Sequence, residues 1–108
     1  MAKGKYVRPG EVVDYTNSGE TAIAAGDVVS LSTRIGVAAS TIPAGEWGSV
    51  SVVGVYELPK GNVAVSQGDA VYFSTSTGKI TKTDTDVPAG WAVAGALQAA
   101  DTVLVKIG

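Results

Sequence analysis

A short turn motif, repeated before runs of alternating apolar residues, constrains the fold of this chain more than any other feature. The segment AAGDVVSL at 24–31 is echoed by SQGDAVYF at 66–73, an offset of 42 residues. Weaker copies are RPGEVVDY at 8–15 and PAGEWGSV at 43–50. In each copy a glycine precedes an acidic residue, and a strand-like run follows. Turn chemistry alone could produce this echo, so the sequence leaves open whether the chain is internally duplicated.

The acids of this motif can be interpreted as reactive carboxylates or as turn residues that start strands. Glycine adopts the positive φ of a tight turn, and the carboxylate after it can accept backbone N–H groups that the turn leaves unpaired. Four uses in one chain favour the structural interpretation over a special chemical role for any one acid, such as Asp69. The predicted turn residues are Gly10, Glu11, Gly26, Asp27, Gly45, Glu46, Gly68 and Asp69.

Apolar residues alternate with a period of two in several short windows, as half-buried strands require. These windows are 12–15, 28–31, 50–58, 71–73, 79–83 and 103–107, with 71–83 forming a hairpin. The chain has 17 valines and 10 threonines against 4 leucines, and side chains branched at Cβ suit a pleated sheet. The pair Val52 and Val53 before Gly54 predicts a β-bulge or a sharp bend. We therefore predict an all-β fold, a small compact β-barrel or sandwich of about eight or nine short strands with Gly-rich turns and little helix.

The length of 108 residues is that of a single domain. We expect residues 11–108 to form one β-barrel-like domain and residues 1–10 to form an N-terminal arm. The arm, MAKGKYVRPG, carries three of the eight cations of the chain. It is either a frayed end or a segment that becomes ordered on a partner. The residues of the arm expected to contact that partner are Lys3, Lys5, Tyr6, Val7 and Arg8.

Charge and hydropathy argue against two classes of partner. The chain has 10 acids against 8 bases, a net charge of −2, and so lacks the surplus of Lys and Arg that nucleic-acid binding requires. No apolar segment follows the N-terminal cations as in a signal peptide, and none approaches the ~20 residues of a membrane span. We therefore expect a soluble chain, made in the cytosol, with no nucleic-acid or membrane partner.

The residues that most enzymes use for chemistry are missing. The chain has no histidine and no cysteine, the commonest groups for proton transfer, nucleophilic attack and zinc binding. A phosphate-binding loop would need a glycine five residues before Gly78, where Phe73 stands. Asp84 and Asp86 in TDTDV come nearest to a metal site, but the calcium-loop pattern is incomplete and we interpret them as a solvated loop. Nothing selects a pair of acids for glycosidase-type chemistry. We predict no enzyme activity, no catalytic residue, and no metal or cofactor.

Four large side chains are candidate interface anchors. Trp47 and Trp91 each follow an Ala-Gly turn, while Tyr56 and Leu58 lie in the segment GVYELPK. Each tryptophan is either a residue at the edge of the core or an anchor for a partner, because tryptophan and tyrosine are favoured at the centres of interfaces. If both tryptophans and Tyr56 gathered in one exposed groove, the chain would instead be a small β-barrel that binds a ligand or serves as an adaptor.

Several segments, in their order and spacing, resemble one family. These are GDVV followed by IGVA, GVYELPK at 54–60, GDAVYFSTSTGKIT at 68–81, and GALQAADTVLVKI at 95–107. They are similar to the phage capsid cement, or head-decoration, proteins, a family formerly catalogued as a domain of unknown function and as a predicted RecA/RadA-type recombinase. The recombinase label does not fit this chain, which lacks the phosphate loop and is too short for that ATPase core. The compact AADTV segment and Trp91 depart from the family pattern.

The resemblance implies a compact β-barrel-like domain, often assembled as a homotrimer. It implies a structural protein that binds the outer surface of the assembled head, between subunits of the major capsid protein, and stabilises it. Its partners would be that lattice and copies of itself. It would be made in the cytoplasm of the bacterial host and reside on the virion. The alternative is a small β-barrel ligand-binding or adaptor protein of a phage particle.

Overall fold

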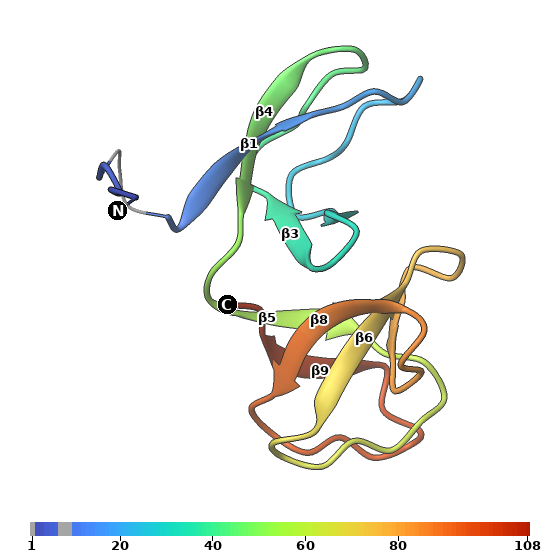
Figure 1. The fold of residues 1–108 in the computed structure, drawn as a ribbon. Helices are drawn as coiled ribbons and strands as arrows, with labels where there is room; N and C mark the ends of the chain where they lie inside the picture. The colour runs from blue at the N-terminus through green and yellow to red at the C-terminus, as the bar shows by residue number, and fades with distance from the viewer. Residues whose placement is uncertain (1, 7–9) are drawn as a thin grey trace.

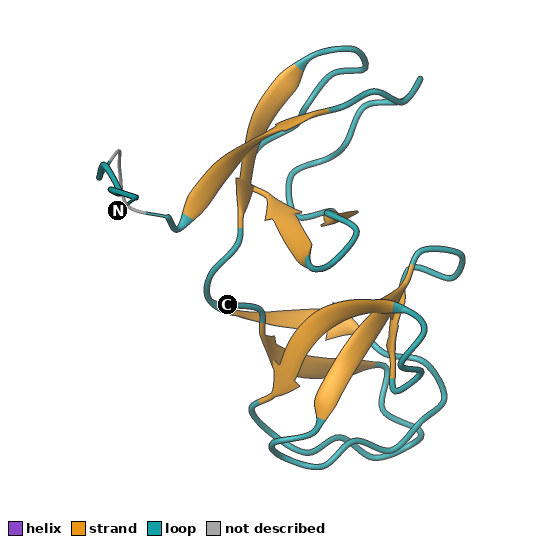
Figure 2. Cartoon of the chain, viewed as in Figure 1, coloured by secondary structure: helices purple, strands orange, loops and turns teal. Residues whose placement is uncertain are grey.

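The computed structural model describes residues 2–6 and 10–108, and in these residues the regular structure consists of nine β-strands with no helix (Figure 2). The strands are β1 (Val12–Thr16), β2 (Val28–Ser30), β3 (Ile35–Ala38), β4 (Trp47–Ser51), β5 (Val55–Pro59), β6 (Ala70–Ser74), β7 (Lys79–Thr81), β8 (Val87–Ala92) and β9 (Thr102–Lys106). The predicted all-β class and strand number are confirmed, as is the expectation of little helix.

The strands form two antiparallel sheets, each the framework of one lobe (Figure 1). The N-terminal lobe, residues 11–52, has the strand order β1-β4-β3-β2, and the C-terminal lobe, residues 54–108, has the order β5-β9-β8-β6-β7. In the described residues no sheet closes into a barrel, so the sandwich form of the prediction is the one that fits. The expected hairpin at 71–83 is present as the pair β6 and β7.

The junction between the lobes is the bend that the sequence predicts at Val52, Val53 and Gly54. Gly54 has a φ of 127°, a conformation that side chains rarely tolerate, and β5 begins at the next residue. The backbone N–H of Ile107 donates a hydrogen bond of 3.0 Å to the carbonyl of Gly54, which fixes the C-terminus beside this junction (Figure 1). The pairing also has a β-bulge elsewhere, where β8 shifts register against Val71 and Tyr72.

The two lobes repeat one topology, with β7 as an extra strand after β6. In the N-terminal lobe, the N–H of Gly26 donates to the carbonyl of Ala38 at 2.8 Å, and the N–H of Ala38 donates to the carbonyl of Asp27 at 2.9 Å. In the C-terminal lobe, Gly68, Ala92 and Asp69 make the same two bonds, at 2.7 and 2.9 Å. An antiparallel bridge precedes each turn and pairs Ile23 with Ile42 and Val65 with Ala96. Turn chemistry does not dictate these distant pairings, so the chain contains a structural duplication.

The hydrophobic core is asymmetric with respect to the duplication. The small core of the N-terminal lobe consists of Val29, Ala38, Ile42 and Val50. A larger cluster consists of the core of the C-terminal lobe together with two residues of β3, Ile35 and Val37. These two side chains are 1% and 5% exposed, and Val28 of β2 packs beside them. One face of the N-terminal sheet therefore covers the core of the C-terminal lobe.

Candidate interaction surface

Two of the four turn motifs form the same carboxylate turn. Gly26 and Gly68 both have a φ of 90°, with open space where a Cβ would lie. Oδ2 of Asp27 accepts the N–H of Ala24 at 3.0 Å, and Oδ2 of Asp69 accepts the N–H of Ser66 at 2.9 Å. Each carboxylate thus closes the turn that precedes a strand. Their position and bonding are those of structural residues.

The carboxylate of Asp69 has one further partner. In the described residues no such partner is present at Asp27, the corresponding residue of the N-terminal lobe. Nζ of Lys82 lies 2.9 Å from Oδ2 of Asp69 and forms an ion pair at the surface. The backbone N–H of Ser66, and secondly the ammonium of Lys82, hold the pKa of the Asp69 carboxyl below its usual value. The carboxylate of Asp69 is therefore stabilised as an anion and engaged by neighbouring groups.

The other two copies of the motif rely on backbone bonds. Gly45 has a φ of 78°, and the N–H of Glu46 donates to the carbonyl of Pro43 at 3.1 Å. The carbonyl of Glu11 accepts the N–H of Val52 at 2.9 Å, at the edge where β1 begins beyond Gly10. Within the described part of the chain neither glutamate side chain has a hydrogen bond, so these copies share the sequence pattern but not the carboxylate turn.

Two buried polar side chains were not singled out by the sequence. Asn17 and Lys60, 4% and 3% exposed, occupy corresponding positions directly after β1 and β5. The amide of Asn17 donates to the carbonyls of Thr21 and Ile42 at 2.8 and 3.0 Å. Nζ of Lys60 donates to three carbonyls, of Gly61 at 2.8 Å, Val63 at 2.8 Å and Gln98 at 3.0 Å. Both residues tie loops to a strand end. The only hint of this in the sequence is a polar residue at the fourth place of both DYTN (14–17) and ELPK (57–60).

The aspartate pair of TDTDV is partly engaged by its own loop. The carboxylate of Asp86 accepts the hydroxyl of Thr81 at 2.6 Å, and the N–H of Asp86 donates to the carbonyl of Thr83 at 3.0 Å. In the described residues no group of three or more acids lies close enough to hold a metal ion. The geometry therefore selects no ion-binding role for Asp84 or Asp86.

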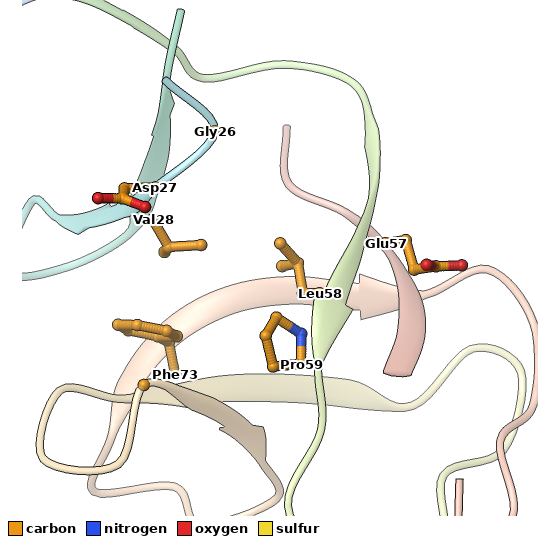
Figure 3. A pocket seen from close by; sticks show the side chains of 8 residues that line it. Gly26, Asp27, Val28, Glu57, Leu58, Pro59 and Phe73 are labelled. Carbon is orange, nitrogen blue, oxygen red and sulfur yellow. The ribbon is translucent and has the colours of Figure 1, made fainter. Parts of the chain in front are cut away.

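A cavity of about 320 Å³ opens at the seam between the lobes (Figure 3). Two acids line it, Asp27 from the N-terminal lobe and Glu57 from the C-terminal lobe, together with Val28, Leu58 and Phe73 among others. The side chain of Glu57 points away from Asp27, whose carboxylate closes its own turn (Figure 3). The acids do not face one another across the cavity, so it does not form a carboxylate pair.

The four candidate anchors are distributed over both sheets. Trp47, 67% exposed, pairs with Thr16 of β1, whereas Trp91, 44% exposed, stands on the C-terminal sheet. Tyr56 is half-buried, and Leu58, 4% exposed, lies in the core of the C-terminal lobe. Neither tryptophan lines the seam cavity or a second hollow beside Val65 and Leu97. The structure therefore leaves the tryptophans exposed on separate sheets and does not gather them in one groove.

The arm presents its side chains to solvent as far as the structure describes it. Lys3 and Lys5 are exposed, and Tyr6 is 80% exposed. Val7 and Arg8, which complete the expected contact segment, lie outside the described residues. The arm leads into β1, which is an edge strand of its sheet (Figure 1). Among the described residues there is no helix of sufficient length and hydropathy to cross a membrane.

Comparison with known proteins yields one match. A family model described as phage cement protein matches residues 7–107, which is nearly the whole chain. No curated protein and no solved structure matches.

Proposed function

The chain belongs to the phage cement protein family, and from this premise we propose that it is a structural protein of the virion. It binds the outer surface of the assembled phage head, between subunits of the major capsid protein, and stabilises the shell. The observation that carries this proposal is the family match over residues 7–107. The carboxylates of Asp27 and Asp69 support it, because they hold turns rather than face a substrate.

A cement protein stabilises the shell by binding to it and does not need to catalyse a reaction. A protein that binds the assembled lattice but not free capsid subunits shifts the assembly equilibrium towards the intact shell by mass action. A homotrimer would engage three lattice sites at once and gain avidity without tighter contacts at any one site. Such a protein needs a rigid body and a complementary surface, and the two β-sheets supply the body.

The arm, residues 1–10, is assigned to the capsid contact, and residues 11–108 to the body. Lys3, Lys5 and Tyr6 are exposed and lead into the edge strand β1, whose free edge can pair with an extended segment of a partner. Trp47 lies on the neighbouring strand, β4, and adds an exposed aromatic side chain to the same sheet. The arm and the N-terminal lobe together therefore combine cations, a strand edge that is unpaired among the described residues, and an exposed aromatic side chain.

The test is addition of the purified protein to expanded phage heads that lack it. We expect the protein to cosediment with these heads and to raise the temperature at which they rupture. Deletion of residues 1–8 should abolish cosedimentation while the unfolding midpoint of the free protein stays unchanged, because no arm residue that the structure describes belongs to either core cluster. A matched control replaces Lys79 and Lys82, two exposed cations of the C-terminal lobe, with serine.

Two results would contradict the proposal. If the intact protein fails to bind expanded heads, it is not a cement protein of that head. If the truncated protein binds as well as the intact one, the arm is a frayed end and the contact lies elsewhere. The alternative of a ligand-binding or adaptor barrel gains no support from the structure, because its aromatic candidates stand on different sheets.

A further inference from the structure

The duplication makes the two sheets comparable residue by residue. One row crosses the N-terminal sheet through the paired residues Val12, Ser51, Val37 and Val28. The same row crosses the C-terminal sheet through Val55, Lys106, Trp91 and Ala70. We call these rows the N-terminal row and the C-terminal row. They occupy the same face of their respective lobes because the strand pairing around them is the same.

The N-terminal row is used inside the chain. Val37 is 5% exposed within the large core cluster, and Val28 packs against that cluster. Val28 shares the lining of the seam with Leu58 and Phe73 of the C-terminal lobe (Figure 3). The β2 and β3 end of this row, Val28 and Val37, is therefore part of the surface by which one lobe covers the interior of the other, while Val12 at its β1 end is 39% exposed.

The C-terminal row has no such cover. Trp91 is 44% exposed and Val55 is 54% exposed, and Ala70 is exposed as well. Leu104, 40% exposed, pairs with Glu57 beside this row and extends the apolar surface. Val37 and Val28 are buried or half-buried in the first repeat, whereas their counterparts Trp91 and Ala70 are open to solvent in the second.

The interiors of the two lobes show the opposite difference. In the C-terminal lobe four apolar side chains are buried, with exposures between 4% and 8%: Leu58, Val65, Phe73 and Ile107. Their counterparts in the N-terminal lobe are only half-buried: Tyr15, Ile23, Leu31 and Val52. The positions, strands and side-chain types are alike, so the cover supplied by the other lobe accounts for the difference.

We propose that copies of this chain bind one another head to tail, with the C-terminal row of one copy covering the open interior of the N-terminal lobe of the next. This contact between two chains has the same form as the contact between the two lobes of one chain. It brings the exposed apolar surface around Trp91 against the half-buried side chains around Tyr15 and Leu31. Within one chain, Val28 and Phe73 line the same cavity between the lobes. Their counterparts are Ala70 and Leu31, so Ala70 of one copy should face Leu31 of the next.

This arrangement is heterologous, because the two surfaces in contact differ. Heterologous contacts form a closed ring when the rotation closes and an open filament when it does not. Three copies in a ring would place six similar lobes around the axis. The number three rests on the homotrimer of the proposed function, whereas the head-to-tail contact rests on the duplication alone.

Engineered disulfides test the contact directly. The chain has no cysteine, so thiols introduced at Ala70 and Leu31 are the only ones present. We expect the double variant Ala70→Cys, Leu31→Cys to give, on oxidation, covalent species larger than a dimer, ending at the size of the ring. Neither single variant should cross-link, because head-to-tail packing does not bring a position against itself. Cross-linking of a single variant to dimers, or a double variant that stops at dimers or stays monomeric, would overturn the proposal.

A matched pair of tryptophan substitutions provides an independent test. Trp91→Glu should weaken self-association at least tenfold in sedimentation velocity, whereas Trp47→Glu, a change of the other exposed tryptophan, should leave it unaltered. Circular dichroism checks that both variants fold. If Trp91→Glu keeps its mass but loses binding to expanded heads, that face meets the capsid and the self-contact is refuted. If Trp91→Glu loses self-association but still binds expanded heads measurably, the self-contact is supported independently of the cement function.

Discussion

The buried ammonium group of Lys60 offers the sharpest test of how this fold is held together. Its side chain is 3% exposed and donates to the carbonyls of Gly61, Val63 and Gln98. The last of these acceptors lies 38 residues away, in the loop before β9. Replacement of Lys60 by Met keeps the apolar stem and its packing but removes all three donors.

The cost follows from these contacts. Hydrogen bonds to a charged group contribute about 1.5–3 kcal/mol each, and a buried carbonyl left without a partner costs about 1–3 kcal/mol. Release of the ammonium from its desolvated site offsets part of this loss. Gln98 is exposed and Gly61 and Val63 are half-buried, so water can reach some of the freed carbonyls. We expect Lys60→Met to lower the free energy of unfolding by about 3 kcal/mol, a large part of the stability of a small domain.

Urea unfolding followed by circular dichroism measures this difference. With an m-value of about 1.5 kcal/mol/M, the urea midpoint should fall by about 2 M. The control is Lys82→Met, the same change at a lysine whose side chain is 42% exposed in a surface ion pair, and it should cost less than about 1 kcal/mol. A Lys60→Met variant within 1 kcal/mol of the wild type would show that Lys60 is not a structural link between the loops (a threshold of about one neutral hydrogen bond).

Other residues give further predictions. The pKa of Asp69 is lowered in the folded state, so its contribution to stability is present above the unfolded value of 3.8 and is lost as the pH falls through the lower folded value. Asp69→Asn should therefore be less stable than wild type at pH 7, and urea titrations should show the difference shrinking below about pH 4; a constant difference would contradict the assignment. Gly90→Ala should cost about 4 kcal/mol or more, because φ is 127° and the new Cβ would collide with the carbonyl oxygen of Lys106. Gly26→Ala, where the surrounding space is open, should cost about 1–2 kcal/mol, and equal urea midpoints for the two variants would refute the steric argument.

The parts of this fold that the sequence predicts are those set by local chemistry. Alternation, Cβ branching and Gly-Asp turns act over a few residues, and they predicted most of the strands and the turns at Asp27 and Asp69. The strands β3 and β8 lie outside the predicted windows. The duplication was hidden because β7 is inserted after β6, which changes the spacing of every later counterpart. A search at the fixed offset of 42 residues therefore matches the turns and the strands β2 and β6, but not the later strands of each lobe.

The buried polar groups and the exposed anchors depend on contacts between distant segments. Nothing near Lys60 in the sequence shows that the carbonyl of Gln98 will approach it. The sequence likewise treats Trp47 and Trp91 alike, since each follows an Ala-Gly turn. The structure places them on strands that are not counterparts, Trp47 on β4 beside Thr16 and Trp91 on β8 between Ala70 and Lys106.

The packing of the N-terminal sheet over the C-terminal core is the basis of the proposed head-to-tail contact. A lobe of this kind has an open interior and an outer face able to cover the interior of another lobe. Two lobes in one chain satisfy one such contact and leave one interior, around Tyr15 and Leu31, and one covering face, around Trp91, unsatisfied. A third lobe in the chain would cover one of these two surfaces but would itself add another surface of the same kind, so one interior and one covering face would still be exposed. With the proposed head-to-tail contact, a closed ring of identical chains would cover every interior, and the arm would remain available for the proposed contact with the capsid.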